Sequence, residues 1–128
     1  MATGDKLASI LSKQAPLLPP RELRSTKRRW VRVPMNVRVC LAYEENGIHQ
    51  QCYCRSFEVS EGGMGLMSPY ELQLDKVVRL EFSLPHGKMP LQLRAVVRSK
   101  VGFRLGLEFI SPTDAERSEL VRYTKAMQ

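Results

Sequence analysis

Apolar and polar residues alternate along most of the chain from Val33 onward. Successive side chains of a β-strand point to opposite faces, so an apolar residue at every second position indicates a half-buried strand. Four stretches follow this period, and we expect Arg94 and Arg98 to face solvent on the third of them. The apolar positions are Val33, Met35, Val37, Val39 and Leu41; Val78, Leu80, Phe82 and Leu84; Leu91, Leu93, Ala95 and Val97; and Phe103, Leu105, Leu107 and Phe109.

Turn residues separate these strands and add two more. Asn46-Gly47 is a strong hairpin signal, because both residues tolerate the positive φ of a tight primed turn. A second strand should run from about Ile48 to Val59, and a short third one should follow Gly62-Gly63 as far as Met67. Residues 85–88 (Pro-His-Gly-Lys) turn the chain again, which gives six strands in all.

The last segment of the chain is predicted to be helical. Ser111 or Thr113 can cap the helix, and Glu116 stands where it completes a Thr-x-x-Glu capping box. A modest apolar stripe follows at Leu120, Val121, Thr124 and Met127. Short strands, tight turns and one terminal helix predict a mainly β fold, namely a six-stranded antiparallel β-barrel with a C-terminal α-helix.

The length and charge distribution predict one domain behind a basic leader. The 128 residues suffice for one hydrophobic core, and we expect a flexible leader over 1–26 and the barrel domain over 27–128. Residues 1–32 hold eight Lys or Arg against two Asp or Glu, whereas the remaining residues hold twelve against eleven. The positive charge is therefore local, which favours an anion site over a basic face spread across the fold.

No stretch has the length and hydrophobicity that a membrane-spanning helix needs, and the first residues lack the apolar core of a secretory signal. We therefore expect a cytoplasmic protein without a membrane span. Cys40, Cys52 and Cys54 lack the spacing of a redox or zinc motif, so we expect reduced, partly buried thiols and no metal site. We also expect no enzyme, because no nucleophile and base stand at a suggestive spacing.

Two short segments carry candidate binding chemistry. Residues 27–32 (Lys-Arg-Arg-Trp-Val-Arg) supply guanidinium groups four positions apart, and residues 58–63 (Glu-Val-Ser-Glu-Gly-Gly) supply a carboxylate, a hydroxyl and bare backbone. Arginine binds phosphate or guanine with two parallel hydrogen bonds, and a carboxylate accepts from N–H groups. Together these segments suit a ligand that carries both phosphates and a purine edge.

These residues resemble the signature of the PilZ domain, a bacterial receptor domain for cyclic di-GMP. Arg28-x-x-x-Arg32 directly before Val33-Pro34 is similar to that family's R-x-x-x-R motif, and Glu58-x-Ser60-x-x-Gly63 to its (D/N)-x-S-x-x-G motif. Residues 96–98 (Val-Val-Arg) and 105–109 (Leu-Gly-Leu-Glu-Phe) resemble its final hairpin. The resemblance covers residues 27–127, and it favours Arg28 and Arg32 over the alternative pair Arg24 and Arg28.

The resemblance implies a cyclic di-GMP site on a six-stranded barrel. Arg28 and Arg32 would bind phosphates and guanine edges, Glu58 would accept from guanine, Ser60 would hydrogen-bond the ligand, and Gly63 would keep the strand surface clear. Arg29 would assist through its charge. The implied protein is a non-enzymatic receptor without a cofactor. Its N-terminal loop would close over the ligand and signal to a downstream protein partner.

Two other functions remain open at this point. Glu58 stands where the family has Asp or Asn, so a ligand-free adaptor that keeps only the barrel is one alternative. The other is a small basic nucleic-acid-binding barrel. It is disfavoured because the predicted strands are nearly neutral and lack interleaved basic and aromatic residues.

Overall fold

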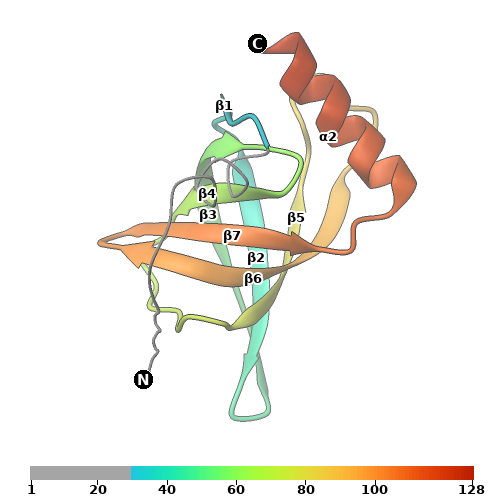
Figure 1. The fold of residues 1–128 in the computed structure, drawn as a ribbon. Coiled ribbons are helices and arrows are strands. Elements are labelled where there is room, and N and C mark those ends of the chain that lie inside the picture. The colour runs from blue at the N-terminus through green and yellow to red at the C-terminus, as the bar shows by residue number, and fades with distance from the viewer. Residues whose placement is uncertain (1–29) are drawn as a thin grey trace, which may run out of the picture. The chain divides into compact units, whose positions relative to one another are not determined.

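The computed structural model describes residues 30–128, and the proposed leader over 1–26 lies outside them. Contacts divide the chain into two units, Met1–Val31 and Arg32–Gln128, and the fold described below is that of the second unit (Figure 1).

Within residues 30–128, six antiparallel strands close into a barrel, as predicted, and a seventh, short strand pairs with the end of one of them (Figure 1). The order around the ring is β3-β2-β5-β6-β7-β4, and β4 pairs again with β3 to close it; β1 pairs with the end of β3. The strands are β1 (Val33–Pro34), β2 (Arg38–Glu45), β3 (Ile48–Val59), β4 (Gly63–Met67), β5 (Val77–Phe82), β6 (Leu91–Val101) and β7 (Arg104–Ile110).

The barrel interior contains the apolar residues that the alternation predicted. Val39 and Leu41 on β2, Leu80 on β5 and Val97 on β6 are almost completely buried, and Arg94 and Arg98 are exposed. The Asn46-Gly47 hairpin also forms as predicted, with φ of 53° and 78° at its two turn residues. The period of two therefore identified the interior face correctly over most of the barrel.

Two strand predictions were wrong in detail. The predicted strand from Val33 to Leu41 is interrupted between β1 and β2, because the Ser56 hydroxyl bonds both the Met35 carbonyl and the Val37 amide. Phe103 does not enter the interior; it lies in the two-residue turn between β6 and β7, and 67% of it is exposed. Local hydrogen bonds and turn geometry thus override the alternation at these positions.

The terminal helix α2 spans Asp114–Ala126 and begins with the predicted capping box. The Glu116 amide donates to the Thr113 hydroxyl, and the Thr113 amide donates to the Glu116 carboxylate. Leu120 and Thr124 are buried, whereas Met127, the C-cap residue of the helix, is 48% exposed. Within residues 30–128, no helix is long and apolar enough to cross a membrane.

Candidate functional site

A β-bulge in β3 determines which way Glu58 points. The pairing of β3 with β4 shifts register between Ser56 and Glu58, so Phe57 is an extra residue in the strand. Cys54 and Ser56 face inward before the bulge, and Val59 faces inward after it. Because a bulge moves the strand's alternation by one position, Glu58 points outward instead of into the core.

Arg32 and Glu58 meet on this outer surface. The Arg32 Nη1 atom lies 3.4 Å from the Glu58 Oε2 atom, and the side chains are 53% and 32% exposed. Strand β1 brings them together, because Val33 and Pro34 pair with Val59 and Glu58. An ion pair this exposed contributes only about 0–1 kcal/mol to stability. Both groups therefore remain available to a charged ligand at little energetic cost.

Ser60 shapes the bend between β3 and β4. Its hydroxyl accepts from the Gly62 and Gly63 amides at 3.1 and 3.2 Å, and its own amide donates to the Gly63 carbonyl. The Gly62 carbonyl accepts from the Phe109 amide on β7, which holds the bend against the barrel. Ser60 is buried, so the observed role of its hydroxyl is to close this turn.

Gly63 is needed for the close approach of β4 to β7. A Cβ atom at this position would collide with the backbone carbonyl oxygen of Leu107. Gly63 pairs with Glu108 in the ladder, so the collision could be relieved only by moving a barrel strand. The observed requirement for glycine is thus backbone packing. The predicted role of leaving a clear surface for a ligand stays a separate hypothesis.

Contacts from two other elements hold β1, the strand that directly follows Arg32. The Ser56 hydroxyl joins the loop after β1 to β3, as described above, and the Met35 amide donates to the Phe57 carbonyl. From the terminal helix, the Tyr123 hydroxyl donates to the Pro34 carbonyl at 3.0 Å. The position of Arg32 therefore depends on the helix as well as on the barrel.

A second ion-pair group lies beside the bend. Arg98 on β6 donates to Glu108 on β7 at 2.7 Å and to Asp75 at 3.2 Å. The hydrogen bond to Glu108, together with the nearby carboxylates, raises the pKa of Arg98, which stays protonated. Because Glu108 pairs with Gly63, Glu108 connects this ion-pair group to the strand that leaves the bend.

The structure places three of the predicted site residues with Arg32 near one end of β3: Glu58, Ser60 and Gly63. Arg28 and Arg29 lie outside the described residues, so their part in the site stays a prediction. Sequence reasoning missed Phe57, whose ring stacks with the Arg104 guanidinium at 4.9 Å and covers Gly65. The break in alternation between Cys54 and Val59 is the signal that could have revealed the bulge.

The cysteines lie away from this bend. Cys54 is buried and Cys52 half-buried on the inner side of β3, and all three thiols are free. Burial, with the neighbouring Cys54 thiol, raises the pKa of Cys52 to about 11. Cys52 therefore stays protonated at neutral pH and is a weak nucleophile. Within residues 30–128, no three His, Cys, Asp or Glu side chains cluster closely enough to hold a metal ion.

Comparisons with known proteins agree with this fold. The family model described as "PilZ domain" matches residues 26–126. No curated protein sequence matches the chain significantly. Among solved structures, the Bacillus subtilis inhibitor of motility (MotI/DgrA) superposes with a TM-score of 0.64 at 22% identity, over 77% of this chain and 50% of that chain. The chain thus spans half the length of that protein.

Two further structures are PilZ domains by their own descriptions. The PilZ domain of CeSA from a cellulose-synthesising bacterium gives a TM-score of 0.59 at 17% identity, over 75% of this chain and 96% of that one. The Escherichia coli YcgR PilZ domain, solved with c-di-GMP, gives a TM-score of 0.59 at 18% identity, over 79% of this chain and 91% of that one. At these identities the structures establish the fold alone, whereas the family model matches most of the sequence. The chain belongs to the PilZ domain family.

Proposed function

We propose that this protein is a non-enzymatic, cytoplasmic receptor for cyclic di-GMP, with its site at Arg32, Glu58 and the Ser60–Gly63 bend. The PilZ family is a family of cyclic di-GMP receptors that are generally not enzymes. The observation that carries the proposal is the exposed Arg32–Glu58 pair on the outer surface of the barrel. It holds a cation and an anion side by side, as a ligand with phosphates and N–H donors requires.

On binding, Arg32 and Glu58 would give up their contact with each other and form contacts with the ligand. Arg32 would turn its guanidinium to a phosphate or to a guanine edge, and Glu58 would accept from guanine N–H groups. The exchange is favourable because the existing pair is exposed, long and weak, whereas a well-formed hydrogen bond to a charged group contributes about 1.5–3 kcal/mol. Arg28, with help from Arg29, would supply the second cation from the N-terminal loop.

The proposed signal is a change in the N-terminal loop. Residues 27–32 would close over the bound dinucleotide, and the ordered surface would then be recognised by a downstream protein partner. Any change at Arg32 would reach the helix through β1, because Pro34 on β1 accepts the Tyr123 hydrogen bond from α2. Both Pro34 and Glu58 lie on the same strand pair.

Isothermal titration calorimetry with cyclic di-GMP tests the site. Arg28→Ala and Arg32→Ala should each weaken binding at least about tenfold, and the double variant at least about a hundredfold. Glu58→Gln should also weaken binding, because the amide presents one acceptor atom and adds a donor beside Arg32. The same titration gives the stoichiometry, which distinguishes one bound molecule from an intercalated pair.

A matched control comes from the other end of the barrel. Lys100 on β6 forms an ion pair with Glu71 at 3.1 Å, so Lys100→Ala also removes one cation from a surface pair. It should leave the affinity unchanged. Unchanged affinity in both arginine variants would refute the site. If well-folded protein binds no cyclic di-GMP, the protein is a ligand-free adaptor. If it binds RNA in a salt-sensitive manner and shows no preference for cyclic di-GMP, it is a nucleic-acid-binding barrel.

A further inference from the structure

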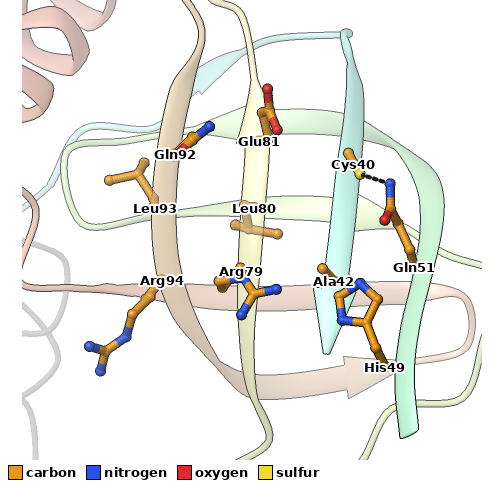
Figure 2. A pocket seen from close by; sticks show the side chains of 10 residues that line it. All are labelled: Cys40, Ala42, His49, Gln51, Arg79, Leu80, Glu81, Gln92, Leu93 and Arg94. Carbon is orange, nitrogen blue, oxygen red and sulfur yellow. Dashed lines mark hydrogen bonds between the residues drawn. The ribbon is translucent and has the colours of Figure 1, made fainter. Parts of the chain in front are cut away.

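A groove on the outer face of the barrel lies away from the proposed cyclic di-GMP site. It has a volume of about 370 Å³ and runs over β3, β2, β5 and β6 (Figure 2). Its residues on β3 are His49 and Gln51; Gln51 precedes Glu58 by seven positions, roughly 20 Å of extended strand. The volume lies within the range of small-molecule sites, about 300–1,000 Å³.

Ladder register explains how the groove is built. Gln51 pairs with Ala42, Ala42 with Arg79, and Arg79 with Arg94, so these four residues form one row across four strands. Ala42 has the smallest side chain in the row and leaves space between Gln51 and the two arginines. Figure 2 shows Arg79 and Arg94 at the end of the groove opposite Glu81; the Arg79 guanidinium is directed toward Ala42 and His49, and the Arg94 guanidinium points away from Arg79.

The pairing of Arg79 with Arg94 is unfavourable by itself. Like charges directly opposite each other on neighbouring strands repel and destabilise a sheet. Neither side chain has an ion pair, hydrogen bond or ring contact with another residue in the range 30–128. The other arginines on the barrel strands do have partners: Arg38 stacks on Tyr53, Arg55 bonds Asn36, Arg98 bonds Glu108 and Asp75, and Arg104 stacks on Phe57.

We propose that this groove binds a small phosphorylated compound, whose phosphate is bound by Arg79 and Arg94 once their exposed side chains turn toward it. Two guanidinium forks offer more donors than one carboxylate can accept, whereas a phosphate has three terminal oxygens and a second negative charge. At the other end, Glu81 would repel an anion but can accept from N–H groups, and Gln92 beside it can both donate and accept. The groove thus suits a ligand with a phosphate at one end and N–H donors at the other.

Nuclear magnetic resonance with inorganic pyrophosphate as the probe tests the site residue by residue. In the wild-type protein, the Arg79 and Arg94 Nε–H signals and the Gln51 side-chain amide signals should shift and saturate. Arg79→Gln with Arg94→Gln should weaken this binding at least about a hundredfold. Arg117→Gln is the matched control, because Arg117 on α2 is also exposed and its side chain has no partner within residues 30–128.

Thermal unfolding at low ionic strength supplies a second readout. Without pyrophosphate, the double variant should melt above the wild type, because the repulsion is gone. Added pyrophosphate should raise the Tm of the wild type and of Arg117→Gln more than that of the double variant. Equal effects on all three proteins, or shifts confined to the surroundings of Arg32, would overturn the proposal. Arg32→Ala should leave the groove signals intact, which separates this site from the proposed cyclic di-GMP site.

Discussion

At the scale of single residues, the two halves of the candidate site differ in what they contribute. Arg32 and Glu58 are exposed and weakly paired, so they can change partners at little cost to the stability of the fold. Ser60 and Gly63 are part of the backbone architecture, since one closes the bend and the other permits the approach of β7. Loss of binding therefore identifies a ligand contact only for the first two residues.

Gly63→Ala should destabilise the barrel. The added methyl group would collide with the Leu107 carbonyl oxygen, and overpacking of this kind costs about 1–3 kcal/mol. Urea unfolding should show a lower midpoint with an unchanged slope. Glu61→Ala, in the same bend, should leave the midpoint close to that of the wild type. Equal midpoints for Gly63→Ala and Glu61→Ala would contradict the packing argument.

At the scale of elements, local sequence signals specify the regular turns and caps, whereas tertiary contacts specify the irregularities of the strands. The hairpin at Asn46-Gly47 and the capping box at Thr113 are specified within a few residues, and both form as predicted. The bulge at Phe57 and the interruption after β1 depend on partners far along the chain, since Ser56 bonds Met35 and Val37. These two irregularities are the features that bring Arg32 and Glu58 to one surface.

Thr113→Ala should weaken helix α2. The variant removes the hydroxyl that accepts from the Glu116 amide, and the loss of such a cap costs about 1 kcal/mol. Circular dichroism during thermal unfolding measures the effect as a lower Tm. Ser118→Ala is the control, because it replaces an exposed residue inside the same helix with a better helix former. A Tm for Thr113→Ala at or above that of Ser118→Ala would argue against the cap.

At the scale of the barrel domain, the helix and the candidate site are joined through β1. The barrel closes through the pairing of β3 with β4, and β1 extends it beside the end of β3. Tyr123 on α2 reaches Pro34 on β1, so the helix contacts the strand that follows Arg32 directly. A ligand that moves Arg32 would therefore strengthen or weaken the hydrogen bond between Tyr123 on α2 and Pro34 on β1.

Tyr123→Phe should loosen β1 without disturbing the barrel core. The variant removes one hydrogen bond, whose net contribution is about 0.5–1.5 kcal/mol. Hydrogen exchange should become several-fold faster at the Met35 amide, which donates to Phe57, and stay unchanged at Leu80 in the core. Tyr53→Phe, at an exposed tyrosine on β3, should change neither amide. Unchanged exchange at Met35 in Tyr123→Phe would show that the helix does not hold β1.

The amino-acid sequence alone was sufficient to predict the barrel, most of its interior face, the Asn46-Gly47 hairpin turn and the capped helix. These features follow from alternation, turn residues and capping residues that act within a few positions of one another. It also identified Arg32 and Glu58, which are 26 positions apart, as candidates through two separate motifs. Local rules do not determine which face a strand presents after an irregularity, because one extra residue reverses it.

The tertiary structure was needed to establish that Glu58 faces outward, that Ser60 closes the bend, that Gly63 lets β4 approach β7, and that Arg79 stands opposite Arg94. The bulge before Glu58 and the Arg79–Arg94 pair depend on the register between consecutive strands, and the approach at Gly63 depends on the register between β4 and β7, which are distant in sequence. Register is set by the packing of the whole barrel, which no short window of residues contains.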